Sequence, residues 1–186
     1  MRNFLKVCDG INVEPLNFLL KKNSHLWNQK TLRKDQANSP HLEMSDIWVR
    51  YNNDQEAKAT GDYSEFHEQH YPVWYPCIDK LPMIRNISLA LMAKMGAVHL
   101  GGVLITKIPP GGRIEPHIDS NWHAQFYNCK LYVPIQTNRY CINRCEDEIV
   151  TMNTGECWYF NNNVEHEVKN DGNDDRITLI ICMRVE

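Results

Sequence analysis

The sequence predicts a mainly β protein whose strands form a sandwich or a barrel. From residue 101 onward, short runs rich in β-branched and alternating apolar residues are separated by turn residues such as proline, glycine and asparagine. Seven or eight runs at this spacing are typical of a β-sandwich or barrel. The chain has 186 residues, the size of one domain or of one domain with an extension. Its 42% hydrophobic fraction is that of an ordinary globular protein.

The first part of the chain, residues 1–62, is predicted to be an N-terminal extension of helix and loop. Residues 14–22 carry leucines three and four positions apart, as on one face of a short amphipathic helix. Residues 28–46 hold few apolar side chains and predict a loop. Basic residues gather here, at Lys21, Lys22, Lys30, Arg33 and Lys34. They could contact an acidic partner, although a solvated face is the more common role of such a cluster.

The second part, residues 63–186, is predicted to hold the β domain and a helix that precedes it. Residues 63–82 are rich in aromatic side chains and proline, and predict an ordered loop with packed rings. Residues 83–95 have the apolar spacing of a helix, and Gly96 provides its stop. Strands are predicted at residues 101–108, 115–119, 129–136, 148–152, 156–160, 165–168 and 176–185.

Charge, hydropathy and cysteine content exclude several classes of protein. The net charge is −3, so no overall positive field favours a nucleic acid. No run of 18 apolar residues predicts a transmembrane helix, and Asp9 and Gly10 interrupt the N-terminus before a signal-peptide core could form. Seven cysteines without a CxxC pattern predict free thiols rather than disulfides or a zinc site. We therefore expect a cytoplasmic protein without a membrane partner.

A candidate metal site begins in the run EPHID. His117 and Asp119 are separated by a single residue in a predicted strand, so their side chains point to the same face. An imidazole beside a carboxylate provides two ligands of a metal site, and His166 in the run EHEV could provide a third. Two histidines and one carboxylate are the ligands of non-haem Fe(II) oxygenases, which keep coordination positions open for substrate and O₂. The HxD pattern alone is weak evidence, because it occurs often by chance.

Arg176 lies ten residues after His166 and strengthens this interpretation. Residues 164–169 and 175–184 are predicted to pair as a hairpin around the loop NDGND, which would place Arg176 on the same face as His166. A buried guanidinium without an anion is costly. Arg176 therefore predicts an anionic ligand, and a co-substrate carboxylate could bind it through two hydrogen bonds.

Four further side chains have competing interpretations. Trp122 and His123 follow the HxD pattern and could line a substrate-binding mouth, as loops of barrels often do. His123 is also the alternative to His166 as the second histidine ligand, but a predicted turn separates it from the HxD pattern, so His166 is preferred. His67 and His70 are expected to form a polar surface pair, because no carboxylate or thiolate pattern accompanies them.

These motifs together resemble a known family. The segments GGVLITKIPPGGRIEPHIDSN, NCKLYVPIQTN and ECWYFNNNVEHEVKNDGNDDRITLIICMRV are similar to the aspartyl/asparaginyl β-hydroxylase branch of the 2-oxoglutarate- and Fe(II)-dependent dioxygenases. The resemblance covers about residues 70–186. Its specificity lies in the combination of HxD, the distant histidine of EHEV and the arginine ten residues later. The first sixty residues show no such resemblance.

The resemblance implies a double-stranded β-helix, the jelly-roll or cupin-like fold, with helices from the N-terminal part packed outside. It also implies that His117, Asp119 and His166 are the ligands of Fe(II). The animal β-hydroxylases lack the acidic ligand, whereas Asp119 is present here. The complete triad is closer to small bacterial or phage members, which weakens transfer of the animal substrate.

The resemblance further implies residues that bind the co-substrate. Arg176 matches the partner of the distal carboxylate of 2-oxoglutarate, and Thr106 matches a hydroxyl that contacts the co-substrate. On the strand after the HxD motif, the animal enzymes use arginine and histidine. This chain has Lys130 and Tyr132 on that strand, and we take both as candidates for co-substrate contacts.

The implied reaction is a hydroxylation that consumes O₂ and 2-oxoglutarate and releases succinate and CO₂. We expect the substrate to be a protein or peptide side chain. The alternatives are a free amino acid, another small metabolite or, as third choice, a nucleobase, because the charge is acidic and aromatic and basic residues do not interleave. A non-catalytic cupin-like module that binds a metal or ligand is the rival from another class. It has no need for both a complete triad and Arg176.

Overall fold

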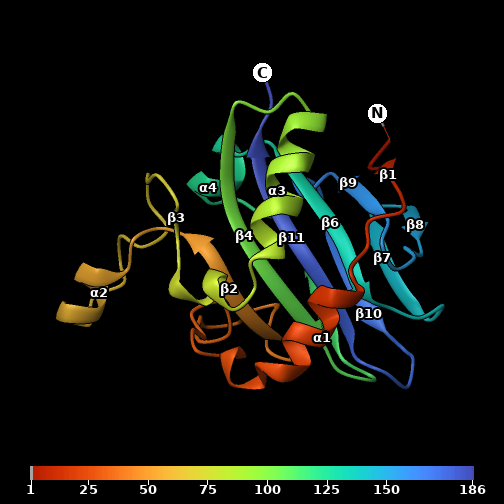
Figure 1. The fold of residues 1–186 in the computed structure, drawn as a ribbon, viewed down its shortest axis with the longest axis horizontal. Helices are drawn as coiled ribbons and strands as arrows, with labels where there is room; N and C mark the ends of the chain where they lie inside the picture. Colours follow the sequence, from red (N-terminus) through yellow and green to blue (C-terminus); the bar gives the residue numbers. More distant parts are fainter. Residues whose placement is uncertain (1) are drawn as a thin grey trace.

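The computed structural model describes residues 2–186, and its centre is a pair of antiparallel β-sheets packed face to face (Figure 1). The strands of the larger sheet are, in order across it, β1 (Phe4–Cys8), β9 (Cys157–Phe160), β6 (Cys129–Gln136), β11 (Arg176–Arg184), β4 (His99–Ile108), β2 (Ser45–Tyr51) and β3 (Val73–Trp74). The strands of the smaller sheet are, in order across it, β5 (Arg113–His117), β10 (His166–Asn170), β7 (Cys141–Cys145) and β8 (Glu148–Val150). This confirms the predicted mainly β, jelly-roll fold.

Helices cover the outer face of the larger sheet. In Figure 1, α1 and α3 lie across β4, β11 and β6, while α2 projects from one end of the molecule. The helical segments are α1 (Glu14–Lys22), η1 (Ser24–Leu26), α2 (Gln55–Thr60), η2 (Pro76–Asp79), α3 (Met83–Lys94) and α4 (Trp122–Phe126). The predicted helices at 14–22 and 83–95 are therefore confirmed. In the described part of the chain, no helix combines the length and apolarity needed to cross a membrane.

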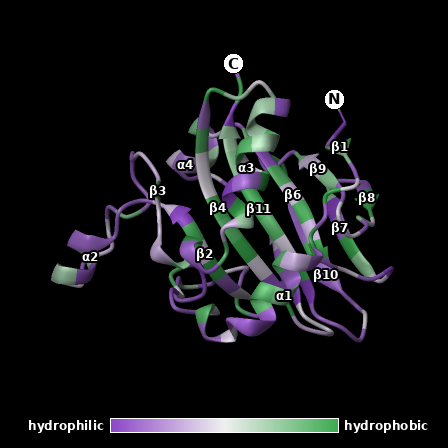
Figure 2. Ribbon diagram, in the orientation of Figure 1, coloured by the Kyte–Doolittle hydropathy of each residue, from purple (hydrophilic) through white to green (hydrophobic). Residues whose placement is uncertain are grey.

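Alternation along the central strands separates a packing face from a site face. One face of β6 carries Leu131, Val133 and Ile135. These side chains pack in the same hydrophobic cluster as the leucines of α1 and α3. Lys130 and Tyr132 point to the opposite face, toward the smaller sheet. Hydrophobic residues make up most of β11 (Figure 2), as expected for a strand covered on both faces, whereas β6 alternates between hydrophobic and hydrophilic residues.

The N-terminal part differs from the prediction of helix and loop. Residues Phe4–Cys8 form β1, which pairs with β9, and residues Ser45–Tyr51 form β2, which pairs with β4. β2 was missed because its seven residues lie between polar segments, yet Ile47 and Val49 belong to the core beneath the helices. Two strands that precede residue 62 therefore belong to the larger sheet, β1 at one edge and β2 next to β3 at the other.

The predicted hairpin of residues 164–169 and 175–184 is wrong. β10 pairs with β5 and β7 in the smaller sheet, whereas β11 pairs with β4 and β6 in the larger one. The NDGND segment thus crosses from one sheet to the other. Arg176 is opposite Ile108 in its ladder and still faces the interior, because Ile177 and Leu179 occupy the outer face of β11.

Candidate metal centre

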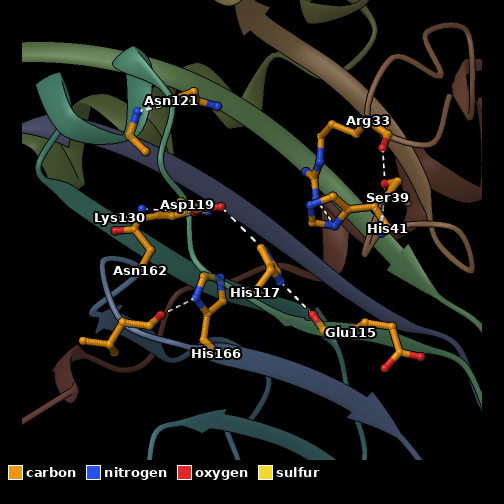
Figure 3. Close-up of polar contacts among 12 residues, drawn as sticks. Arg33, Ser39, His41, Glu115, His117, Asp119, Asn121, Lys130, Asn162 and His166 are labelled. Atoms are coloured by element: carbon orange, nitrogen blue, oxygen red, sulfur yellow. Dashed lines mark hydrogen bonds and ion pairs between the residues drawn. The ribbon is translucent and has the colours of Figure 1, made fainter. Parts of the chain in front are cut away.

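Three predicted ligands converge between the two sheets (Figure 3). His117 on β5 and His166 on β10 are directly opposite each other in the antiparallel ladder, and their ring centroids are 4.2 Å apart. Opposed residues share a face, so both imidazoles point the same way. Asp119 Oδ1 lies 3.6 Å from His117 Nε2. One ligand atom from each of the three residues lies within 4.8 Å of the other two.

The backbone determines which nitrogen each ligand histidine offers. His117 Nδ1 is 2.7 Å from the Glu115 carbonyl, and His166 Nδ1 is 3.0 Å from the Val164 carbonyl. Because a carbonyl can only accept, both Nδ1 atoms carry the proton and both Nε2 atoms keep a lone pair. Burial lowers the pKa of His117, and it lowers the pKa of His166 to about 4. Both rings are therefore neutral near pH 7.

Asp119 is held as a carboxylate. Lys130 Nζ lies 2.6 Å from its Oδ2, and the Asn162 side chain donates to the same oxygen at 3.0 Å. Burial alone would raise the pKa of Asp119. The charge of Lys130, its hydrogen bond to the carboxylate and the two neighbouring imidazoles together outweigh burial, so the pKa lies well below its usual range. Two neutral imidazoles and one carboxylate form the donor set that suits a non-haem iron(II) ion, so these residues fit that metal.

A cavity of about 440 Å³ opens beside the triad. Its wall includes Lys130 and Tyr132 of β6, His123 of α4, and Arg33 and His41 of the loop that precedes β2. This volume lies in the range of small-molecule sites. The site therefore combines both sheets with residues from the N-terminal part of the chain.

Arg176 is a buried cation without an acidic partner. Its side chain is 3% exposed, and its Nη2 donates to Asn143 Oδ1 at 2.8 Å. Among residues 2–186, no carboxylate forms an ion pair with it. It lies outside the cavity lining but 5.6 Å from the ring centroid of Tyr132, which is part of that lining. A buried, unpaired guanidinium is costly, which favours binding of an anion here.

The other sequence-predicted residues have different surroundings. Thr106 is fully buried, and its hydroxyl donates to Asp46 Oδ1 at 2.9 Å, so it is engaged within the protein. His123 is buried and lines the cavity. Trp122 is half-buried and stacks on Phe126, with centroids 5.0 Å apart. The roles assigned to Thr106, His123 and Trp122 stay predictions.

The interpretation of His67 and His70 as a polar surface pair is wrong. His70 is buried and stacks on His123, with ring centroids 5.6 Å apart and planes 15° apart. His67 lines the cavity, and its Nδ1 is 3.1 Å from the Tyr51 hydroxyl. His70 is buried and His67 half-buried because aromatic side chains of β2 and Phe66 of the loop after α2 pack around them.

Sequence reasoning missed several residues of the site. Asn162 holds Asp119, Asn143 holds Arg176, and His41 lies edge-on to His117 with centroids 4.9 Å apart. Asn162 lies four residues before a predicted ligand, which is a usable signal. His41 carried no such signal, since only the fold brings the loop of residues 28–44 to β5, where the Glu115 amide donates to the Pro40 carbonyl at 3.0 Å.

Comparison with known proteins identifies similar sequences and folds. The family model described as aspartyl/asparaginyl beta-hydroxylase matches residues 11–185. No curated protein matches the chain. An oxidoreductase of the 2OG-Fe(II) oxygenase family from Burkholderia pseudomallei has a TM-score of 0.58 and 10% identity, over 97% of this chain and 82% of that one.

The viral collagen prolyl hydroxylase of Paramecium bursaria Chlorella virus-1, solved with 2OG, has a TM-score of 0.54 and 10% identity. This similarity covers 100% of this chain and 97% of that one. At these identities, both similarities concern the fold.

Proposed function

This chain belongs to the aspartyl/asparaginyl β-hydroxylase family and is a 2-oxoglutarate/Fe(II)-dependent hydroxylase, and from this premise we propose that it hydroxylates a protein or peptide side chain. The reaction would consume O₂ and 2-oxoglutarate and release succinate and CO₂. The family match and the fold shared with a collagen prolyl hydroxylase support a peptide substrate. A free amino acid, another small metabolite or a nucleobase would use the same chemistry.

The observation that carries this proposal is the donor set of the triad. His117, Asp119 and His166 would hold the iron through two Nε2 lone pairs and one carboxylate oxygen. When bound, the iron supplies the activation of O₂ that the hydroxylation requires. The protein's part is to fix the ligand tautomers, to keep Asp119 charged and to position co-substrate and substrate in one cavity.

Arg176 is the proposed partner of the distal carboxylate of 2-oxoglutarate. It is the buried guanidinium without an acid partner described above, and a carboxylate would satisfy it bidentately. Lys130 and Tyr132 line the cavity beside the triad and are proposed as further co-substrate contacts, with Thr106 as a fourth. Trp122 and His123 are proposed to contact the substrate.

Anaerobic titration with Fe(II) and 2-oxoglutarate, followed by visible absorbance, tests the site. The chelated co-substrate should give a weak charge-transfer band that His166→Ala and Asp119→Ala abolish. The exposed His25 lies outside the cavity lining, so His25→Ala is the matched control and should keep the band. Under air, the unaltered protein should release succinate from 2-oxoglutarate.

The other outcomes are equally informative. Metal binding without the band would contradict the co-substrate assignment and support the cupin-like binding module. Failure to bind any divalent metal would contradict the triad itself. Mass spectrometry of peptides incubated with the active protein would then test the substrate class, because hydroxylation adds one oxygen atom.

A further inference from the structure

Two cavity histidines outside the triad have partners that can only donate. Arg33 Nη2 lies 3.0 Å from His41 Nδ1, and a guanidinium has no acceptor (Figure 3). The Gly102 amide donates to His123 Nε2 at 2.9 Å. His41 Nδ1 and His123 Nε2 must therefore be unprotonated. Each ring is a neutral imidazole whose proton lies on the other nitrogen. His123 is therefore protonated on Nδ1, as the metal ligands are, whereas His41 is protonated on Nε2.

The protonated nitrogen of each ring is free to bind a ligand. Within residues 2–186, neither His41 Nε2 nor His123 Nδ1 has a hydrogen-bond partner, and neither belongs to the fully buried polar atoms that lack one. His70 Nε2, by contrast, is fully buried and has no hydrogen-bond partner in the described part of the chain. Since His41 and His123 both line the cavity, their free N–H groups are available to its contents.

Both rings are held firmly in place. The His41 amide donates to the Ser39 hydroxyl at 3.1 Å, and the neighbouring Pro40 carbonyl is tied to β5. His123 sits against the backbone of β4, where a Cβ on Gly102 would lie 3.0 Å from its Nε2. The close approach of His123 to the strand thus depends on a residue without a side chain.

The two cations of the cavity lining are already engaged. Lys130 pairs with Asp119 at 2.6 Å, and Arg33 lies 3.6 Å from Asp46 in addition to its contact with His41. The N–H groups of His41 and His123 are among the lining donors that have no partner within residues 2–186, and both are neutral. Neutral donors satisfy a neutral acceptor without leaving a buried charge uncompensated, so an amide oxygen suits them better than a carboxylate or an ammonium group.

We infer that His41 and His123 are substrate-positioning residues, which donate Nε2–H and Nδ1–H to amide carbonyl oxygens of a peptide substrate. The inference rests on the proposed function for the identity of the substrate. Binding of an amide group by these donors requires no metal and no co-substrate.

The test uses the metal-free full chain with ring-¹⁵N-labelled histidine, and N-methylacetamide as the probe. NMR should show a protonated Nε2 in His41 and a protonated Nδ1 in His123. N-Methylacetamide should shift both resonances, whereas methylammonium, which has no acceptor, should not. Acetate should shift them less than the amide does.

Amide variants separate the donor from the other nitrogen, because the asparagine amide reaches the position of Nδ1 and the glutamine amide reaches that of Nε2. His41→Gln and His123→Asn keep the donor and should bind N-methylacetamide nearly as the unaltered chain does. His41→Asn keeps only the group that faces Arg33, and His123→Gln keeps only the group that faces Gly102. Both variants lose the donor to the probe and should bind N-methylacetamide roughly fivefold more weakly, the loss expected for one neutral hydrogen bond.

This crossed pattern distinguishes donation from a merely structural role, which would make Asn and Gln rank alike at both positions. Equal ranking, the opposite tautomers, no shift with N-methylacetamide, or equal shifts with methylammonium or acetate would each overturn the inference. Because iron and 2-oxoglutarate are absent from the test, failure of the proposed hydroxylase function would leave its result unchanged.

Discussion

Lys130 and Asp119 form an ion pair within the metal centre, with Nζ 2.6 Å from Oδ2. The lysine side chain is 16% exposed and the aspartate side chain 20% exposed, so both charges depend on each other for compensation. Burial opposes the charge of Lys130, but Asp119 raises its pKa above the ordinary value. The pair keeps the carboxylate ionised in the metal-free protein, and it also places a positive charge next to the position of a divalent cation.

Lys130→Met should therefore have opposite effects on stability and on metal binding. Leaving Asp119 uncompensated should lower the free energy of unfolding of the metal-free protein by roughly 3 kcal/mol. Removing the neighbouring positive charge should raise the affinity for a divalent metal on the order of tenfold. Urea unfolding and calorimetric titration with Mn(II) measure the two effects, and Lys130→Arg should change both less. A loss of metal affinity in Lys130→Met would show that the lysine assists metal binding instead.

Arg176→Met should separate co-substrate binding from stability. The arginine is buried without an acidic partner among the described residues, so an apolar side chain of similar length should leave the unfolding free energy unchanged or higher. The affinity for 2-oxoglutarate should fall at least about tenfold, because a charged hydrogen-bond pair is lost. Thermal unfolding and equilibrium binding of 2-oxoglutarate measure these quantities.

Asn143→Leu is the matched control for Arg176. It leaves the guanidinium without its present partner and should cost roughly 1–3 kcal/mol of stability. If Arg176→Met destabilised the protein and kept full affinity for 2-oxoglutarate, Arg176 would be a structural residue.

The triad could be predicted because its signals are local. The strand period predicts that His117 and Asp119 share a face, although β5 ends at His117 and Asp119 lies just beyond it, and the run EHEV points to His166. The direct pairing of His117 with His166 could not be predicted, since it depends on how β10 joins β5 across the smaller sheet. The predicted hairpin of residues 164–169 with 175–184 was wrong for the same reason. A five-residue connection fits both a hairpin and a crossing between sheets.

The contribution of the N-terminal part could not be predicted from local pattern. Residues 28–46 have few apolar side chains, and Arg33 and His41 there show no spacing that points to a site. Their positions follow from hydrogen bonds to distant segments, such as the one from the Glu115 amide to the Pro40 carbonyl. Sequence reasoning treated Arg33 as part of a solvated cluster, whereas its Nη1 lies 3.6 Å from the buried Asp46.

Acid should destabilise the metal-free protein between about pH 6.5 and pH 4. Burial lowers the pKa of His123 to about 3 and that of His166 to about 4, from an ordinary value of 6.5. In this window the unfolded chain binds more protons than the folded chain, so stability is full above about pH 6.5 and is lost as the pH falls toward the folded pKa. His166 alone accounts for a loss on the order of 3 kcal/mol.

Urea unfolding at a series of pH values measures this dependence. His166→Gln should reduce its slope, while His25→Ala, at an exposed position, should leave the slope unchanged. A divalent metal binds the neutral imidazoles and should restore part of the stability at pH 5 to 6. A stability that stayed constant from pH 7 to pH 4.5 would contradict the neutral, buried state assigned to these rings.

Gly102→Ala should destabilise the fold through two specific contacts. A Cβ at this position would lie 3.0 Å from His123 Nε2 and 3.1 Å from Tyr51 Cδ2, both in a well-packed region. Overpacking of this kind costs roughly 1–3 kcal/mol. In a His123→Ala background the same substitution should cost less, and the difference is the coupling energy between the two positions.

Gly101→Ala is the control, because its Cβ would lie 2.6 Å from the Tyr127 ring instead, so His123→Ala should reduce the cost of this substitution much less. Thermal unfolding of the single and double variants measures all four costs. If Gly102→Ala cost the same with and without the His123 ring, the glycine would serve the strand itself rather than the position of that ring.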